Sequence, residues 1–482
     1  MQNKAFVHPD TLRIFFATEM WERYGFYVVQ TLLALYLALH FHWPDKQVYG
    51  LVGSFTALTY ISPVIGGWIA DHLIGQKRAI LTGAVVLFAS YIAVAFSMTG
   101  QFLTASLAGI AVGTGLLKPN ISSLLGNEYP VGCPNRESGF TIFYMGITSG
   151  IILGTTIPSY LNDYFGWSIA FVSASMGLLI AIATFTFGVF HYRIKDYRPF
   201  EYQFKNIVLT LLMLFALWLV SFFILNYPAV ADTTFIIVVL MSLAYLLYCV
   251  KYETAMQARQ TLVIILLCII SVTFWAFYFQ MFLSLTLFIS RVVQPELFGI
   301  QFTPPYYVGA QSVGMIVFGL VLARRKSHLN HSEQGIRTGN KFVIAMFFMT
   351  LAYILIALVS HFSYLSALVS PLYIIPAYLM ISLAELFLSP VGLSAITTLA
   401  SPKKVSTMMG IFFVSLGIGG FLSGKLAELT AIPVGETSIS VLKAHYALSF
   451  SHLLYILLVA TLVCVILNLL IRRLMTTSSK GK

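Results

Sequence analysis

The stretch ATEMWERYGFY, residues 17–27, lies inside an otherwise apolar segment that spans residues 12–39. Such a segment is long enough to cross a lipid bilayer as a helix. Glu19, Glu22 and Arg23 fall within five residues there, and each charge near the bilayer centre costs about 2.5–3.5 kcal/mol. Three charges are hard to keep in a membrane helix unless they pair and face a wet cavity. The stretch therefore predicts a membrane helix that lines such a cavity.

The composition of the chain indicates the same class of protein. Its 482 residues are 59% hydrophobic and 9% charged, with a mean hydropathy of +0.87, whereas a soluble protein carries about 25% charged residues. We therefore predict an all-α polytopic membrane protein with little soluble mass. The first apolar segment carries charges that the apolar region of a signal peptide would not, so no cleavable signal peptide is expected.

Fourteen apolar segments are separated by short loops, and each is predicted to be a transmembrane helix. The predicted helices span residues 11–39, 48–70, 77–98, 101–124, 138–160, 167–191, 205–225, 233–250, 260–289, 305–324, 342–360, 368–399, 406–429 and 446–474.

The basic residues indicate how these helices are oriented. With the N-terminus inside, one set of loops holds 22 of the 28 lysines and arginines, whereas the opposite loops hold Lys46, Arg291 and Lys443. This asymmetry follows the positive-inside rule. It predicts a plasma (inner) membrane protein of a bacterial type with both termini cytoplasmic. The basic residues form no single patch, which argues against nucleic-acid binding.

Fourteen helices divide naturally into six, two and six. We expect an N-terminal six-helix bundle over residues 1–191, an inserted two-helix hairpin with linkers over 192–259, and a C-terminal six-helix bundle over 260–482. Two bundles in the same orientation are the parallel-repeat plan of the major facilitator fold. That plan places the substrate site between the bundles near the midplane.

Two glycine-containing motifs lie in the first bundle. The loop GGWIADHLIGQKR, residues 66–78, resembles the loop signature of major facilitators. Asp71 in it could meet a helix N-terminus or a basic partner in one conformation only, as a conformational latch; the alternative is a solvated tight turn. GIAVGTG, residues 109–115, is no phosphate loop because no Ser or Thr follows Lys118. We interpret its glycines as positions of close helix packing.

The charged residues of the first helix share one face. Glu19, Glu22 and Arg23 lie on it at helical spacing, and Tyr27 and Gln30 continue it. Glu19 and Arg23 are also spaced as an i,i+4 ion pair.

Lys118 in the fourth helix and Glu385 in the twelfth are other deeply placed ionisable residues, one in each bundle. Burial and a nearby cation act in opposite directions on the protonation of a carboxyl, so a moving cation could load and release a proton. A contact between Lys118 and Glu385 would close one side of the cavity. The alternative is a static buried ion pair, which contributes little to stability. No histidine is placed to carry the proton, so we expect coupling through carboxylates.

Several motifs together resemble the proton-dependent oligopeptide transporter family of the major facilitators, over nearly the whole chain. EMWERYGFY (19–27) is similar to the ExxERFxYY motif of its first helix. The other matching segments are LTYISPVIGGWIADHLIGQKRAI (58–80), GTGLLKPNISSLLGNEYP (113–130), RESGFTIFYMGI (136–147), TFWAFYFQ (273–280) and AELFLSPVGLSAITTLA (384–400). The resemblance implies a major facilitator fold with two inserted helices and proton-driven import of small peptides.

The resemblance also implies roles for individual residues. Glu19, Glu22, Arg23 and Lys118 match the family's proton-coupling residues. The positions expected to contact substrate are Tyr27, Gln30, Tyr60, Lys118, Thr148, Trp275 and Glu385. Lys118 matches the lysine that meets the peptide carboxylate, and Glu385 the glutamate that receives the amino group. The coupling ion is the proton. The chain has no nucleophile–base pair and no metal-ligand spacing, so we expect no enzyme, metal or other cofactor.

The chain departs from the family pattern at several binding positions. Gln30 stands where members usually have Arg, and Phe279 beside Gln280 where they usually have Glu, so both charges of an outer ion pair are absent. Gln cannot clamp a carboxylate with two parallel hydrogen bonds as Arg does. Thr148 and Gly314 replace two asparagines that hold the peptide. We expect altered peptide selection, and an outer gate that closes by packing and neutral hydrogen bonds.

The function predicted from the sequence is a proton-coupled symporter that imports di- or tripeptides, or peptide-like small molecules, by alternating access and as a monomer. Two alternatives remain open at this point. The first is a transporter of the same fold that exports, or that takes a non-peptide substrate, since fold does not set direction or substrate. The second is a membrane receptor that binds its ligand without transporting it.

Overall fold

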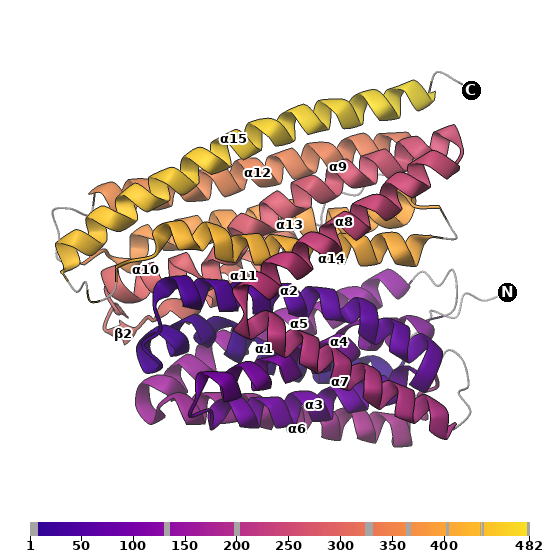
Figure 1. The fold of residues 1–482 in the computed structure, drawn as a ribbon, viewed down its shortest axis with the longest axis horizontal. Helices are drawn as coiled ribbons and strands as arrows, with labels where there is room; N and C mark the ends of the chain where they lie inside the picture. The colour runs from indigo at the N-terminus through magenta and orange to yellow at the C-terminus, as the bar shows by residue number, and fades with distance from the viewer. Residues whose placement is uncertain are drawn as a thin grey trace. The chain divides into compact units, whose positions relative to one another are not determined.

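The structure, a computed structural model, describes residues 8–129, 135–196, 203–322, 331–362, 368–401, 404–433, 435 and 438–479. Within these ranges nearly every residue outside short connections is helical (Figure 1). The long helices are α1 (Thr11–Leu35), α2 (Asp45–Ile69), α3 (Gln76–Ala95), α4 (Gly100–Asn127), α5 (Arg136–Phe165), α6 (Trp167–His191), α7 (Phe204–Asn226), α8 (Pro228–Tyr252), α9 (Ala255–Tyr278), α11 (Pro304–Leu322), α12 (His331–Phe362), α13 (Ile375–Leu399), α14 (Val405–Ala427) and α15 (Ile439–Ser479). The shorter elements are η1 (Tyr36–His40), η2 (Ala70–Ile74), η3 (Phe279–Phe282), α10 (Ser284–Val292), β1 (Glu296–Leu297), β2 (Ile300–Gln301), η5 (Pro371–Tyr373) and η6 (Glu428–Thr430).

These fourteen long helices confirm the predicted all-α membrane architecture. Twelve stretches of the described chain are long and apolar enough to cross a membrane. The other two long helices are α11 and α1, and α1 is the helix that carries the charged motif. The predicted helix over 260–289 is broken, because η3 separates α9 from α10. A two-stranded hairpin, β1 with β2, was not predicted, and it turns through Phe298 and Gly299 with positive φ angles of 52° and 77°.

The helices group into two compact units. The first unit comprises residues 1–36 and 58–227, and the second comprises residues 37–57 and 228–482. The division falls within α2 and again between α7 and α8, so each inserted helix belongs to a different unit. The boundaries predicted from the sequence, at 191 and 260, remain a prediction.

Within the first unit, α3 lies beside α4 and α6, and α1 packs on α5 and α6 (Figure 1). The inserted helix α7 is fixed to α4 by side-chain hydrogen bonds. Trp218 Nε1 donates to the Ala105 carbonyl at 2.9 Å, and Asn226 Nδ2 donates to Thr104 Oγ1 at 2.9 Å. A buried amide or indole N–H needs such a partner where no water is available.

Within the second unit, α12 lies beside α15 and α13, and α9 packs on α14 (Figure 1). The inserted helix α8 contacts α9 and α14. The Lys404 ammonium lies 2.9 Å from Glu253 Oε1, which ties the end of α8 to the start of α14. Both α7 and α8 leave most of their apolar surface uncovered, which is the pattern of helices that face lipid.

Glycines bring α1 close to α5 and α2 close to α4. A Cβ at Gly150 would collide with the Met20 carbonyl, and one at Gly154 would lie 2.6 Å from the Tyr24 carbonyl. A Cβ at Gly66 would collide with the backbone of Gly115. Close packing at the 109–115 motif is therefore confirmed. The α5 glycines hold the charged helix α1 against its neighbour in the manner of a small-xxx-small contact.

Candidate functional site

The charged residues of α1 form one buried cluster in the first unit. Arg23 Nε lies 3.1 Å from Glu19 Oε1 and also contacts Glu22 Oε2. All three side chains are buried, with 0% of Glu22 exposed. The predicted pairing of Glu19 with Arg23 is confirmed. One guanidinium is shared by two carboxylates, so these three α1 residues together carry a net negative charge when both carboxyls are ionised.

Lys118 of α4 belongs to the same cluster. Its ammonium lies 4.1 Å from the centroid of the Tyr60 ring, a cation–π contact. Its charge interacts with those of Glu19, Glu22 and Arg23 across the unit. The four residues expected to couple protons are thus brought together, and Tyr60 is brought with them. Their roles in coupling stay a prediction at this point.

Tyr27, Gln30 and Thr148 are the remaining expected substrate residues of the first unit. Tyr27 packs edge-on against Phe26, with ring centroids 5.5 Å apart. Gln30 is buried on the same helix. The Thr148 hydroxyl donates to the Tyr144 carbonyl of its own helix at 3.2 Å. Its proton is therefore already used, and Thr148 offers a ligand less hydrogen bonding than an asparagine would.

Glu385 of α13 is the charged pole of the second unit, and two neutral donors hold it. Tyr278 OH and Gln311 Nε2 each donate to Glu385 Oε2 at 2.8 Å. Ser382 Oγ in turn donates to the Gln311 carbonyl at 2.6 Å. The sequence patterns do not single out Tyr278 or Gln311 as partners of Glu385. Gln311 lies three residues before Gly314, where the family pattern has an asparagine that holds the peptide. This closeness to an expected substrate position was the sequence signal that could have pointed to Gln311.

Trp275 stands in an aromatic cluster at the end of α9. It stacks on Phe279 with ring centroids 5.4 Å apart and meets Tyr278 edge-on at 4.8 Å. Its indole nitrogen is buried and has no hydrogen-bond partner among the described residues. A buried indole N–H normally finds an acceptor. Trp275 therefore presents an unused donor beside Tyr278, the residue that holds Glu385.

Gln280 is satisfied by neutral hydrogen bonds where the helix breaks. Its Nε2 donates to the Ser423 carbonyl at 2.7 Å, and its Oε1 accepts from Ser284 Oγ at 2.6 Å. Thr286 Oγ1 donates a hydrogen bond to the Met281 carbonyl, which would otherwise lack a partner at the break. Irregular backbone at membrane depth needs such partners. Gln280 therefore supports the η3 break between α9 and α10.

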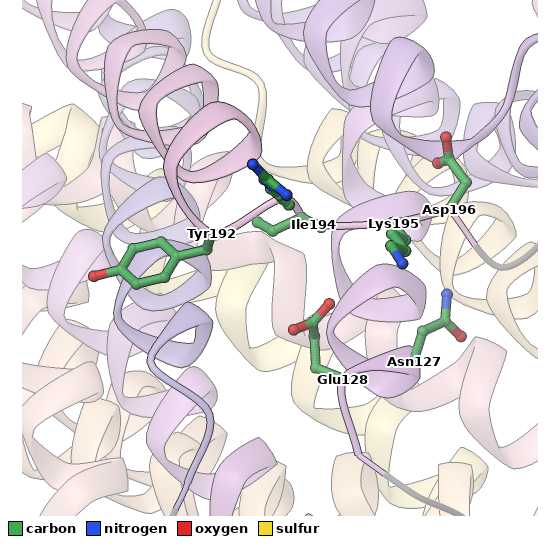
Figure 2. A pocket seen from close by; sticks show the side chains of 7 residues that line it. Asn127, Glu128, Tyr192, Ile194, Lys195 and Asp196 are labelled. Atoms are coloured by element: carbon green, nitrogen blue, oxygen red, sulfur yellow. The ribbon is translucent and has the colours of Figure 1, made fainter.

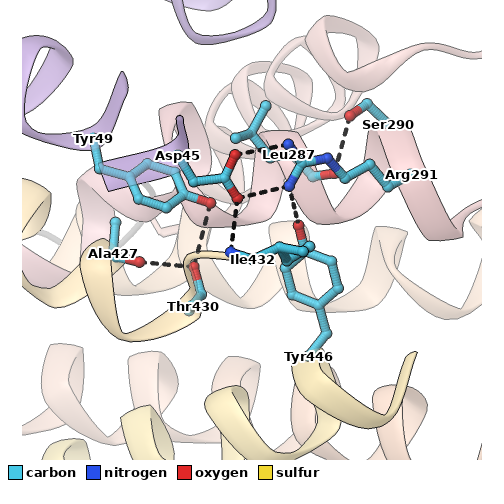
Figure 3. Close-up of polar contacts among 9 residues, drawn as sticks. All are labelled: Asp45, Tyr49, Leu287, Ser290, Arg291, Ala427, Thr430, Ile432 and Tyr446. Carbon is cyan, nitrogen blue, oxygen red and sulfur yellow. Dashed lines mark hydrogen bonds and ion pairs between the residues drawn. The ribbon is translucent and has the colours of Figure 1, made fainter. Parts of the chain in front are cut away.

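An ion pair that the sequence analysis did not predict lies in the second unit (Figure 3). The Arg291 guanidinium donates to Asp45 Oδ1 at 2.7 Å and to Asp45 Oδ2 at 2.8 Å. Asp45 Oδ2 also accepts from the Ile432 N–H at 3.1 Å, and Arg291 donates to Tyr446 OH at 3.0 Å. The pair joins the first residue of α2 to the last turn of α10. The distribution of basic residues in the sequence identifies Arg291 only as one of the few cations in the loops opposite the N-terminus.

Asp71 lies exposed in η2, with no hydrogen bond or ion pair among the described residues. A different residue caps the helix that follows. Asp196 Oδ1 accepts from the Lys77 N–H at 2.8 Å, and its other oxygen lies 3.9 Å from Lys77 Nζ. A carboxylate at the start of α3 is favoured by the helix dipole. The latch role of Asp71 stays a prediction.

Comparison with known proteins gives consistent matches. A sequence model of the POT family matches residues 77–441. Dipeptide and tripeptide permease A of Edwardsiella piscicida is 31% identical over 473 residues, which are 97% of this chain and 94% of that protein. The permease A of Escherichia coli K12 is 30% identical over 446 residues, 90% of this chain and 87% of that protein. A peptide transporter POT solved with alafosfalin superposes with a TM-score of 0.81 at 26% identity, over 98% and 97% of the two chains. Tetrameric PepTSo2 superposes with a TM-score of 0.83 at 26% identity, over 96% and 99%.

Proposed function

Because this chain belongs to the POT family, we propose that it is a proton-coupled symporter that imports di- and tripeptides by alternating access. The matched permeases and peptide transporters extend over nearly its whole length. The observation that carries the proposal at the level of residues is a pair of charged poles. Lys118 provides a cation in the first unit, and Glu385 provides a carboxylate in the second.

The substrate class follows from the chemistry of these poles. A small peptide is a dipolar ion, with a carboxylate at one end and an ammonium at the other. Lys118 is a point charge that attracts the carboxylate without fixing its orientation, since Gln30 supplies no second cation. Glu385 uses Oε2 to accept from Tyr278 and Gln311, and we assign its Oε1 to the peptide ammonium.

Proton coupling is assigned to the α1 cluster. Glu19 Oε2 and Glu22 Oε1 are buried without a hydrogen-bond partner among the described residues. A proton can bind there without breaking an existing hydrogen bond. Protonating one carboxyl leaves Arg23 to pair with the other and changes the net charge next to Lys118. A conformational equilibrium biased by that charge would then follow the proton gradient.

We assign the ion pair between Asp45 and Arg291 a role in the conformational cycle. Asp45 begins α2, whose residues 45–57 belong to the second unit and whose later residues belong to the first. A bidentate bond between Asp45 and Arg291 fixes the start of α2 to α10. We assign it as a latch that forms in one conformation and opens in another. The expected outer closure by packing and neutral hydrogen bonds near Gln30 and Phe279 stays a prediction beside it.

Peptide binding to purified protein tests the assignment of Lys118. The panel is a dipeptide, the same dipeptide amidated at its C-terminus and the same dipeptide acetylated at its N-terminus. Lys118→Gln should weaken the free dipeptide about tenfold or more, because a charge-assisted contact is worth about 1.5–3 kcal/mol. It should leave the amidated peptide nearly unchanged. Equal loss for both peptides would remove the assigned partner. Lys425→Gln, which removes a lysine charge on a different helix, α14, is the matched control.

We further propose that the protein resides in the plasma (inner) membrane with both termini cytoplasmic, which the loop charges support. A monomer is sufficient for this mechanism, although one matched relative was solved as a tetramer. An exporter, a non-peptide transporter or a binding-only receptor is not favoured, since the matched relatives are permeases and peptide transporters.

A further inference from the structure

A pocket in the first unit lies away from both charged poles. It has a volume of about 440 Å³ and lies where α4 ends and the chain leaves α6 (Figure 2). Its lining residues are Asn127, Glu128, Tyr192, Arg193, Ile194, Lys195 and Asp196. The volume lies within the range of small-molecule sites, about 300–1,000 Å³. The loop charges assign this end of the helices to the cytoplasmic side.

The pocket holds two cations that have no partner among the residues that the structure describes. Arg193 and Lys195 are exposed and make no hydrogen bond or ion pair to the residues that the structure describes. The segment that carries them is held in place, because the Ile194 side chain between them is 3% exposed. Two cations that are two residues apart in the sequence and both line the pocket suit a phosphate group.

The two acidic residues of the pocket differ in how many of their oxygens already have partners. Asp196 accepts a hydrogen bond from the Lys77 backbone N–H and pairs with the Lys77 ammonium through its other oxygen. Glu128 accepts one hydrogen bond, from Thr11 Oγ1 to its Oε2 at 2.8 Å. Figure 2 shows the Glu128 carboxylate and the Lys195 ammonium pointing into the space between α4 and the segment 192–196. Glu128 also caps the C-terminal end of α4, where the helix dipole favours a cation. The pocket therefore offers one negative position beside two positive ones.

The pocket opens beside aromatic side chains of a kind found at the membrane surface. Phe187 and Phe190 on the last turns of α6 are 55% and 77% exposed, and Tyr192 is 38% exposed. Tyrosine at the end of a membrane helix is typical of the level of the lipid headgroups, and Tyr192 itself lines the pocket. A ligand in this pocket is thus most readily supplied by the bilayer.

We propose that this pocket binds the headgroup of an aminophospholipid, with its phosphate on Arg193 and Lys195 and its primary ammonium on Glu128. A headgroup with phosphate alone would leave Glu128 facing an anion. A quaternary ammonium would offer Glu128 no N–H to donate. The site therefore distinguishes phosphatidylethanolamine from both phosphatidylglycerol and phosphatidylcholine.

Lipid retention tests this inference separately from transport. Full-length protein is delipidated in detergent and titrated with each of the three lipids, and bound lipid is counted by native mass spectrometry. We expect wild type to prefer phosphatidylethanolamine about tenfold over each of the others. Arg193→Gln with Lys195→Gln should lower phosphatidylethanolamine binding about tenfold, and Glu128→Gln should abolish the preference over phosphatidylglycerol. Lys251→Gln with Arg259→Gln removes two exposed charges outside the pocket and should leave binding unchanged.

Three results would overturn the inference. The first is equal phosphatidylethanolamine binding by wild type and the Arg193, Lys195 double variant. The second is a wild-type preference for phosphatidylglycerol, which would make the site one for anionic lipid. The third is displacement of bound lipid by soluble phosphoethanolamine at equal concentration, which would identify a free metabolite as the ligand. The variant Arg193→Lys with Lys195→Arg keeps both positive charges, so it should retain lipid binding if the charges act directly.

Discussion

Breaking the ion pair between Asp45 and Arg291 should lower the free energy of unfolding, and the geometry of the pair indicates by how much. The guanidinium reaches both carboxylate oxygens, at 2.7 and 2.8 Å. The Asp45 side chain is 5% exposed and the Arg291 side chain 23%. Removing one partner of a buried pair costs about 3–5 kcal/mol, and the partial exposure of Arg291 places this pair near the lower end. We therefore expect Arg291→Gln to lower the free energy of unfolding by about 3 kcal/mol.

The two partners should not be equally sensitive. Without Arg291, the Asp45 carboxylate keeps the Ile432 N–H as its one donor among the described residues. Without Asp45, Arg291 keeps the Tyr446 hydroxyl and some contact with solvent. Arg291→Gln should therefore destabilise more than Asp45→Asn. Asp45→Asn combined with Arg291→Gln should be more stable than Arg291→Gln alone, because the uncompensated charge is removed.

Denaturant titration of the purified protein in mixed micelles measures these differences as a double-mutant cycle. Lys425→Gln provides the control, since the pair of Lys425 with Asp232 is 39% and 44% exposed. Exposed pairs contribute about 0–1 kcal/mol. Equal losses from Arg291→Gln and Lys425→Gln, or a double variant less stable than Arg291→Gln, would refute the reasoning.

Three further variants test proton coupling at Glu19, substrate binding at Glu385 and helix packing at Gly150. Glu19→Gln should abolish proton-driven accumulation in vesicles while leaving peptide exchange, because the shared Arg23 cluster can no longer change its charge at that position; accumulation at the wild-type level would contradict this role. Glu385→Gln should weaken binding of a free-amine dipeptide about tenfold or more, and of its N-acetylated form much less, with Tyr278→Phe showing a smaller effect of the same kind; equal losses for the two peptides would remove the ammonium from Glu385. Gly150→Ala should lower the unfolding midpoint because its Cβ meets the Met20 carbonyl, whereas Gly50→Ala, which has nothing within 4 Å, should be neutral or slightly stabilising; similar midpoints for both variants would show that α1 and α5 can separate without cost.

The sequence predicted the helical architecture because apolar segments of membrane length are a strong and local signal. The same local logic found Glu19, Glu22 and Arg23, since helical spacing alone places them on one face. Charge alone did not place Lys118 with them: it suggested a contact between Lys118 and Glu385, and only the resemblance to the family grouped Lys118 with Glu19, Glu22 and Arg23.

Contacts between distant segments could not be read from the sequence in the same way. Asp45 and Arg291 are 246 residues apart, and each looks like an ordinary residue at a helix end. Tyr278 and Gln311 are common side chains in apolar helices, and only their convergence on Glu385 reveals their role. The break at η3 contains no glycine or proline within its four residues, so the usual sequence marker of an interrupted helix was absent there.

Peptide uptake into proteoliposomes is a direct test of proton-coupled peptide import. An inward proton gradient is imposed, and accumulation of labelled di- and tripeptides is followed with and without a protonophore. If import is coupled to protons, the peptide accumulates above its external concentration, and this accumulation collapses when the protonophore is added. Uptake that only equilibrates, or accumulation that the protonophore does not affect, in protein that still binds peptide, would contradict proton-coupled import.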